Sequence, residues 1–135
     1  MPELPELQAL AEGLDTALRG RPVVVSVHTW SPSSLKTAEP AVESLVGRSV
    51  TGVRRRGTLI IVEFGDLAVV THLMQAGRLG LSTPRGTSVR RPRAWSFGIG
   101  FTGGQMLILR ELSTTRRATV HLVPTQKLDR HPAIA

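Results

Sequence analysis

Short runs of β-branched and other apolar residues, separated by turn signals, constrain the fold of this 135-residue chain more than any other feature. The first such run, "PVVVSVH", begins shortly after Gly20. Gly65-Asp66 and Thr102-Gly103-Gly104 are sequences typical of hairpin turns. We therefore expect eight strands, at residues 22–28, 49–56, 58–64, 67–72, 78–82, 94–101, 105–111 and 118–123. Such a series predicts a mainly β fold, a two-sheet β-sandwich of about eight antiparallel strands.

Residues 3–19 carry a helical period instead. Four leucines recur every three or four positions from Leu4 to Leu14, which predicts an N-terminal helix. Pro5 is tolerated in a first helical turn, and Gly20 is a typical residue just past a helix end. A short second helix of two turns is expected at residues 41–47, "AVESLVG".

The composition fits a single domain with an aliphatic core, since aromatic residues make up only 4% of the chain. The sequence has no cysteine, which excludes disulfides and thiolate-bound zinc within it. Its four histidines lack metal-ligand spacing, so we predict no metal site and no cofactor in this chain. No apolar run approaches the roughly 20 residues that span a bilayer, and the acidic start does not resemble a signal peptide. We expect a cytoplasmic protein without membrane contact.

The net charge of the chain is +7, and nearly all of its positive residues are arginines. An arginine-rich basic domain is suited to a phosphate-bearing partner such as nucleic acid. The same composition is typical of a soluble protein from a genome of high GC content, in which arginine replaces lysine. Composition alone leaves both explanations open.

The opening hexapeptide, "MPELPE", places two chemically useful groups at the N-terminus. Removal of Met1 would expose the secondary amine of Pro2, and an α-amino group titrates near pH ~8, so a substantial fraction is neutral and nucleophilic. Such an amine attacks an aldehyde carbon to give an iminium ion, and Glu3 beside it could move protons. The alternative for Glu3 and Glu6 is helix capping, because a helix dipole favours negative charge in the first turn.

Two later segments have side chains suited to DNA contact. In "THLMQAGRLG" (71–80), a strand ends at His72 and a loop follows that could push side chains into a duplex. In "RELSTTRRATVHLV" (110–123), Arg116 and Arg117 lie in a polar loop, where paired arginines suit phosphate contact or insertion into a base stack. Taken alone, a buried histidine before an ordinary β-connection and a solvated turn are the simpler explanations.

These segments together resemble the N-terminal domain of the formamidopyrimidine-DNA glycosylase / endonuclease VIII family, because "MPELPE", "THL" with "AG", and "TTRRA" occur in the family's order and spacing. The resemblance covers essentially the whole chain. It implies a two-sheet β-sandwich flanked by helices, and base-excision repair of oxidised or ring-opened bases. It also implies that the Pro2 amine attacks C1′ of the damaged nucleotide and that the resulting Schiff base undergoes β,δ-elimination. Glu3 would be the general acid and base, Glu6 would belong to the supporting acidic site, and Arg116 would fill the gap left by the flipped base.

The sequence departs from the family pattern in the segments that meet DNA. Thr58 in "RRRGTLIIVEF" stands where the family has a hairpin lysine that contacts phosphate near the lesion. The family's intercalating methionine falls near Met74 or Gln75, and Ala118 replaces an intercalating aromatic residue. A working enzyme would need another cation in place of the lysine. The candidates are Lys36, Arg54, Arg55 and Arg56.

The family's helix-two-turn-helix module and usual zinc finger would begin just past Ala135. The chain is then either the N-terminal catalytic domain cut from a longer bacterial enzyme or a truncated paralogue, and the abrupt "HPAIA" end favours the first. We expect any zinc ion to be held in a C-terminal domain. The expected partner is double-stranded damaged DNA, the expected state is a monomer, and the expected location is the bacterial nucleoid. The residues expected to contact DNA are His72, Met74, Gln75, Arg116, Arg117, Lys36, Arg54, Arg55 and Arg56.

Three interpretations of function remain. The leading one is a DNA glycosylase/AP lyase that acts through a Pro2 Schiff base. The rival is a non-catalytic DNA-binding paralogue that kept the fold, which Thr58 and Ala118 favour. The retained Pro2, Glu3 and Glu6 argue against this rival, since a pure binding protein gains little from a nucleophile. A structural β-sandwich without a partner is the third.

Overall fold

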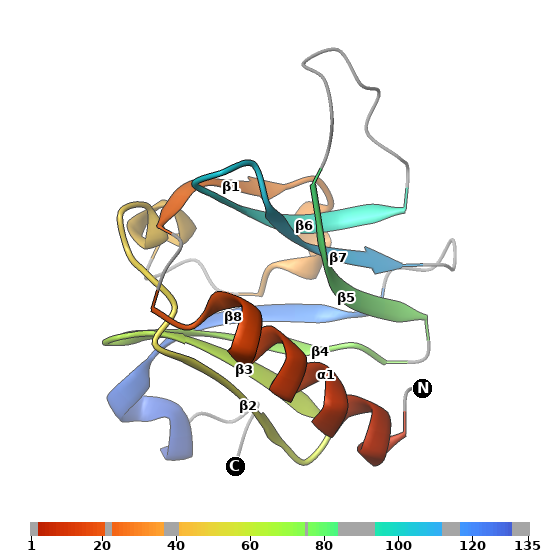
Figure 1. Ribbon diagram of the computed structural model, residues 1–135. Helices are drawn as coiled ribbons and strands as arrows, with labels where there is room; N and C mark the ends of the chain where they lie inside the picture. The colour runs from red at the N-terminus through yellow and green to blue at the C-terminus, as the bar shows by residue number, and fades with distance from the viewer. Residues whose placement is uncertain are drawn as a thin grey trace.

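A computed structural model describes residues 3–20, 23–36, 41–74, 76–83, 94–111 and 117–130. Its eight strands form two four-stranded antiparallel sheets that lie face to face (Figure 1). The first sheet has the order β1-β6-β7-β5, with β1 at Val24–Thr29, β5 at Gly77–Ser82, β6 at Trp95–Phe101 and β7 at Met106–Glu111. The second has the order β2-β3-β4-β8, with β2 at Gly52–Arg56, β3 at Leu59–Phe64, β4 at Leu67–His72 and β8 at Thr119–Pro124. The predicted two-sheet sandwich is confirmed.

The main core lies between the two sheets. Alternate residues of each strand point into it, such as Phe97, Ile99 and Phe101 of β6 and Val62 and Phe64 of β3. This alternation is the period of two that a β-strand imposes on its side chains. The core is aliphatic with a few phenylalanines, as the composition led us to expect.

Strand β4 is buried along almost its whole length because both faces of its sheet are covered. On the outer face, a second apolar cluster of Ile61, Ala68, Val70, Val123 and Leu128 packs beneath the short 3₁₀ helix η3 (Thr125–Arg130). This cluster explains why "LAVVT" is a continuous apolar run and not an alternating one.

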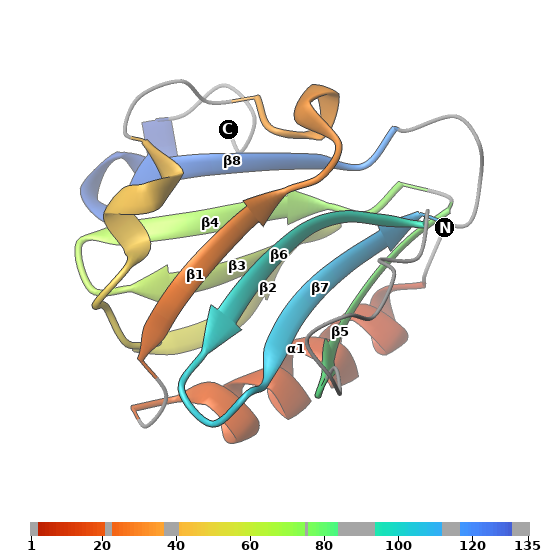
Figure 2. The same ribbon diagram turned by 90° about the horizontal axis from the view of Figure 1, so that it is seen from above.

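The N-terminal helix α1 (Leu4–Leu18) lies along the open side of the sandwich, beside the edge strands β2 and β5 (Figure 2). Leu7, Ala11, Leu14 and Leu18 form its buried face. Burying a leucine side chain contributes about 2 kcal/mol, so these contacts hold the helix against a fixed scaffold. Its bounds lie within one residue of the predicted 3–19.

One carboxylate ties this helix to the sheet. Asp15 of α1 accepts the backbone N–H of Val53 in β2 at 2.8 Å and an N–H of the Arg19 guanidinium at 3.0 Å. The hydrogen bond from Val53, followed by that from Arg19, lowers the pKa of Asp15 below its ordinary value. The outward N–H of an edge strand is thereby satisfied by the helix that covers it.

The expected second helix is shorter and tighter than predicted. Residues 41–47 contain a 3₁₀ helix, η2 (Val42–Leu45), in place of two α-helical turns. Gly47 has φ 89°, a left-handed conformation that ends the segment. A further 3₁₀ helix, η1 (Pro32–Ser34), follows β1 in the chain.

Two glycine-containing turns confirm the predicted hairpins. Gly65 lies between β3 and β4 with φ 74°, and Gly103 and Gly104 lie between β6 and β7 with φ 87°. The basic segment 84–93 and the tail 131–135 lie outside the described residues. Among the described residues, none of the helices combines the length and the apolar character that crossing a bilayer requires.

Candidate active site and nucleic-acid interface

Several of the segments singled out in the sequence meet at one end of the sandwich. Both views show the first turn of α1, the β4–β5 connection, the end of β7 and the start of β8 on the same side (Figures 1 and 2). The strand register gives the same arrangement, since His72 pairs with Leu59 of β3 and with Thr119 of β8. On the facing sheet, Gly77 at the start of β5 pairs with Glu111 at the end of β7.

The carboxylates of the first helical turn are exposed and uncommitted. Glu3 is the N-cap residue by backbone geometry (φ −78°, ψ 159°), yet its side chain makes no capping hydrogen bond. Its carbonyl oxygen accepts the N–H of Leu7 at 3.0 Å. Neither Glu3 nor Glu6 has a side-chain hydrogen bond or ion pair to any residue that the structure describes. Capping by the Glu3 side chain therefore does not account for this residue. Both glutamates are exposed, and Pro2 lies outside the described residues.

The β2–β3 turn brings Thr58 against a histidine. Gly57 takes φ 58° in this turn, and the Thr58 hydroxyl lies 3.3 Å from His72 Nε2, with either group able to donate. Both side chains are half-buried. The position at which the family resemblance implies a lysine therefore holds a threonine that is hydrogen-bonded to a histidine.

The three consecutive arginines of β2 do not share a face. The Arg54 guanidinium pairs with Glu63 at 2.6 Å, and that of Arg56 pairs with Asp129 of η3 at 2.5 Å. Arg55 points the other way, toward α1, as the alternation of a strand requires. Its Nε donates to Gln8 Oε1 at 3.0 Å, and its Nη1 donates to the carbonyl of Gly57 at 2.9 Å. Arg55 is thus the cation attached to the β2–β3 turn.

Lys36 lies farther from that turn. Its backbone N–H donates to the carbonyl oxygen of Val120 in β8 at 2.9 Å. Leu35 also forms a parallel bridge with Val120, so residues 35 and 36 lie along the outer edge of β8. Strands β8 and β4 therefore separate Lys36 from β3, a span of three interstrand spacings or about 14 Å. Of the four proposed substitutes for the missing lysine, Arg55 is the one whose guanidinium is seen to hydrogen-bond to the β2–β3 turn.

The β4–β5 connection is tight and holds a residue in an unusual conformation. Met74 has φ 58° and is the one non-glycine residue with positive φ in the described part of the chain. Gly77 donates its N–H to the Leu73 carbonyl at 2.9 Å, and a Cβ at Gly77 would lie 2.2 Å from that same oxygen. Positive φ in a non-glycine residue costs roughly 1–3 kcal/mol and is concentrated at functional sites. Met74 is half-buried, whereas Gln75 lies outside the described residues.

A buried acid at the end of β7, which the sequence did not predict as a site residue, binds the backbone just before β8. The Glu111 side chain is 2% exposed. One of its oxygens accepts the N–H of Arg117 at 2.9 Å, and the other accepts the N–H of Ala118 at 3.2 Å. The sequence feature that could have indicated Glu111 is its position: an acidic residue at the end of an apolar strand, directly before a polar segment with two arginines. Arg117 is exposed, and Arg116 lies outside the described residues.

Ala118 explains one departure from the family pattern. Its side chain is 1% exposed and belongs to the main core. A large aromatic residue there would overfill the core, so this position cannot present a ring to DNA without a rearrangement of the loop. Among the described residues, no group of three or more histidine, aspartate or glutamate side chains could hold a metal ion.

Comparison with known proteins identifies what the chain is similar to. Residues 1–121 match the family model described as "Formamidopyrimidine-DNA glycosylase N-terminal domain". A formamidopyrimidine-DNA glycosylase of Latilactobacillus sakei is 31% identical over 126 residues, which cover 93% of this chain and 44% of that protein. One of Streptococcus thermophilus is 36% identical over 84 residues, which cover 62% of this chain and 30% of that protein.

Solved structures agree in fold. The Lactococcus lactis enzyme bound non-covalently to DNA with an AP site superposes with a TM-score of 0.81 at 24% identity, over 96% of this chain and 48% of that chain. The same enzyme with DNA containing Fapy-dG gives 0.81 at 25% identity, over 95% and 46%. The chain therefore spans less than half the length of these relatives.

Proposed function

Because this chain belongs to the formamidopyrimidine-DNA glycosylase family, through its N-terminal domain, we propose that it acts in base-excision DNA repair as the catalytic N-terminal domain of a DNA glycosylase and AP lyase. The proposal rests mainly on the first six residues of the chain. The family match includes "MPELPE" at the extreme terminus, and two solvent-facing carboxylates follow Pro2 on a helix that is packed firmly against the sandwich. DNA with an abasic or a ring-opened purine lesion is the proposed substrate.

In the proposed reaction, the lone pair of the Pro2 nitrogen forms a bond to C1′ as the bond from C1′ to the base breaks. The departing base takes up a proton, and opening of the sugar ring leaves an iminium ion. Loss of the C2′ proton then expels the 3′ phosphate, and loss of the C4′ proton expels the 5′ phosphate. Glu3 moves these protons, because its carboxylate is adjacent in the chain and is not committed to a cap. Glu6 completes an acidic first turn.

The DNA would be held by the loops at the same end of the molecule. Met74 would act as the wedge, a role that its strained conformation on the β4–β5 connection supports. Arg116 would fill the space left by the flipped base, and Arg117 would contact phosphates around the lesion. Glu111 positions this second loop through the two N–H groups that it accepts. Arg55, attached to the β2–β3 turn, supplies the positive charge that Thr58 lacks.

A non-catalytic DNA-binding protein is the second candidate. Two observations favour it: the Thr58–His72 hydrogen bond in place of a lysine, and an Ala118 that is buried in the core. In that case the loops would retain their contacts with DNA, and Pro2 would have no role.

Covalent trapping distinguishes the two candidates. We expect the full-length protein with a free Pro2 amine to form a borohydride-reducible adduct with abasic DNA. Pro2→Gly should weaken trapping sharply, and Glu3→Gln should spare trapping more than base excision, because the mutant keeps the amine but loses the proton carrier. The matched control is a protein with a blocked N-terminus. Equal trapping by the blocked and the free protein would rule out Pro2 as the nucleophile.

A further inference from the structure

The outer face of the β1-β6-β7-β5 sheet, away from the core, carries a cluster of aromatic rings. His28 and Trp30 stack with ring centroids 5.1 Å apart and planes 6° from parallel. Trp95 at the start of β6 follows at 5.3 Å from Trp30, tilted by 47°. All three rings are half-buried and so leave part of their surface to solvent. Figure 2 looks onto this sheet.

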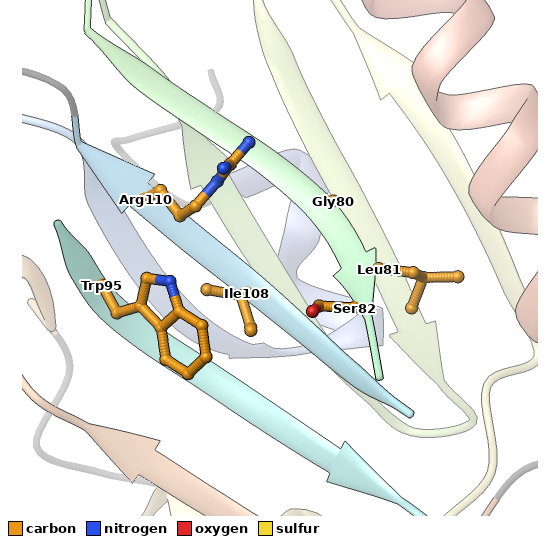
Figure 3. Close-up of a pocket in the computed structure, with 6 residues that line it drawn as sticks. All are labelled: Gly80, Leu81, Ser82, Trp95, Ile108 and Arg110. Carbon is orange, nitrogen blue, oxygen red and sulfur yellow. The ribbon is translucent and has the colours of Figure 1, made fainter. Parts of the chain in front are cut away.

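Glycines make room for the rings on this face. A Cβ at Gly98 would lie 2.7 Å from the Trp30 ring, so the ring rests directly on the backbone of β6. Gly80 has nothing within 4 Å of where its Cβ would be, and this leaves the surface open between β5 and Trp95. A shallow pocket of about 180 Å³ results, lined by Gly80, Leu81, Ser82, Trp95, Ile108 and Arg110 (Figure 3).

The charge of this face is positive. Arg110 is exposed beside Trp95, its partner in the strand register, and its guanidinium makes no ion pair or hydrogen bond within the described part of the chain. Arg78 is the register partner of Arg110 on β5. The four strands contain one acidic residue, Glu111, which is buried and accepts the N–H groups of Arg117 and Ala118. The sequence between Thr83 and Ala94 adds four arginines and no acid.

We propose that this face binds a single-stranded stretch of nucleic acid. Unpaired bases would stack on Trp95 and Trp30, a phosphate would pair with the Arg110 guanidinium, and Ile108 would form the apolar floor. Aromatic rings on a sheet surface with a basic rim are the arrangement that binds single strands, because every base has a face that can stack. A duplex has its base faces already stacked and could offer this surface only its phosphates. The proposal does not rest on Pro2 chemistry.

Intrinsic fluorescence tests it directly, because the chain has two tryptophans, both on this face, and no tyrosine. The 135-residue chain is titrated with a single-stranded dT 12-mer, with a 12-base-pair duplex and with inorganic polyphosphate. We expect the dT 12-mer to quench the emission at a concentration roughly tenfold below that of the other two, because one base stacked on an aromatic ring is worth a factor of this order or more.

Variants locate the site. Trp95→Leu should weaken binding of a dye-labelled dT 12-mer, followed by anisotropy, roughly tenfold, and Trp95→Phe should restore most of the affinity because it keeps a ring. Arg110→Gln should weaken binding about fivefold, the loss of one charge-assisted contact. The matched control is Arg130→Gln, an exposed arginine of η3 beyond the other sheet, which should leave affinity unchanged. Unchanged thermal unfolding of each variant separates lost contacts from misfolding.

Three results would overturn the proposal. The first is equal affinity for polyphosphate and the dT 12-mer, which would mean attraction by charge alone. The second is binding of the 12-mer without a change in tryptophan emission, which would place the strand elsewhere. The third is a full-length protein that fails to bind the 12-mer, which would mean that the rest of a longer chain covers this face. A protein with a blocked N-terminus should bind the 12-mer normally, so failure here and failure of covalent trapping are separate outcomes.

Discussion

Thr58 gives the β2–β3 turn a neutral hydroxyl where a lysine would place a charge. The hydroxyl is 3.3 Å from His72 Nε2, so the site is occupied by a local polar contact. Arg55 holds the same turn through the Gly57 carbonyl. Under the proposed function, the rate of base excision would therefore depend on how well the Arg55 guanidinium on the helix side replaces an ammonium at the turn.

We predict that Thr58→Lys increases excision of an oxidised purine from duplex DNA roughly fivefold to tenfold, because a charge-assisted hydrogen bond is about 1 kcal/mol stronger than a neutral one. Strand cleavage at an abasic site, which needs no base removal, should change little. Thr16→Lys, at an exposed position of α1, adds the same charge away from the turn and should change neither rate. An oxidised purine excised by the wild type as fast as by Thr58→Lys would show that Arg55 already compensates in full.

Glu111 is the residue whose loss should couple stability to DNA binding. Glu111→Ala orphans the N–H groups of Arg117 and Ala118, and each unsatisfied buried donor costs about 1–3 kcal/mol. We expect urea unfolding to show a loss of about 2–6 kcal/mol for the pair, and affinity for abasic DNA to fall at temperatures where the variant is folded.

Glu111→Gln keeps one acceptor oxygen and should lie between the wild type and the alanine variant. Glu43→Ala removes an exposed carboxylate of η2 and serves as the control. An alanine variant at position 111 with full stability and full affinity would exclude a positioning role.

At the scale of elements, Asp15 makes the docking of α1 onto β2 sensitive to pH. Its folded-state pKa is lowered by the Val53 N–H and then by Arg19, so its contribution to stability is present above the unfolded pKa. That contribution is lost as the pH falls through the lower, folded pKa. We predict that Asp15→Asn lowers the thermal midpoint at pH 7 and flattens its decline below about pH 4.

The matched control for this substitution is Asp129→Asn. Asp129 pairs with Arg56, but its side chain is 86% exposed, so solvent screens the pair and the pH profile should keep its shape. Parallel acid profiles for Asp15→Asn and the wild type would mean that the helix is held by its leucines alone.

Strands were predictable from sequence where burial alone decides their residues. "LIIVEF" and "LAVVTH" became β3 and β4 almost residue for residue, because β-branched runs between glycine turns have few alternatives. The predicted strand at 49–56 begins only at Gly52, since Ser49 bridges to Val23 of the facing layer. Such a contact depends on tertiary structure, and so does the strand order in each sheet.

The candidate site was predictable only in part for the same reason. The three arginines of β2 are equivalent in the sequence. In the structure, Arg54 is paired with Glu63 and Arg56 with Asp129, whereas Arg55 makes no such ion pair among the described residues. The alternation of side chains along a strand predicts that Arg55 lies on the opposite face from Arg54 and Arg56. It does not predict which of the two faces meets α1. The role of Glu111 was not predictable because its two partners are backbone N–H groups, and a contact with a backbone group does not depend on which side chain that residue carries.

For the whole molecule, the distribution of charge sets how salt acts on DNA binding. The net charge of +7 predicts affinity that falls steeply with salt, because each phosphate contact on B-DNA contributes about −0.9 to the slope of log K against log salt. Arg117→Gln should reduce the magnitude of this slope by about 0.9, which is the contribution of one phosphate contact. Arg54→Gln should leave it nearly unchanged, since Arg54 is paired with Glu63. The isolated 135-residue chain should prefer damaged DNA only slightly, and affinity independent of salt would contradict the proposed interface.

Both outer strands of the β2-β3-β4-β8 sheet meet a partner from elsewhere in the chain. On β2, the carboxylate of Asp15 takes up the N–H of Val53. On β8, the backbone of Lys36 bonds to Val120. An open strand edge is a template on which a second copy can add its own strand, and proteins avoid aggregation by covering it. These two contacts would therefore oppose self-association through the sheet edges. A variant in which either contact is weakened should become turbid in concentrated solution before it loses its fold.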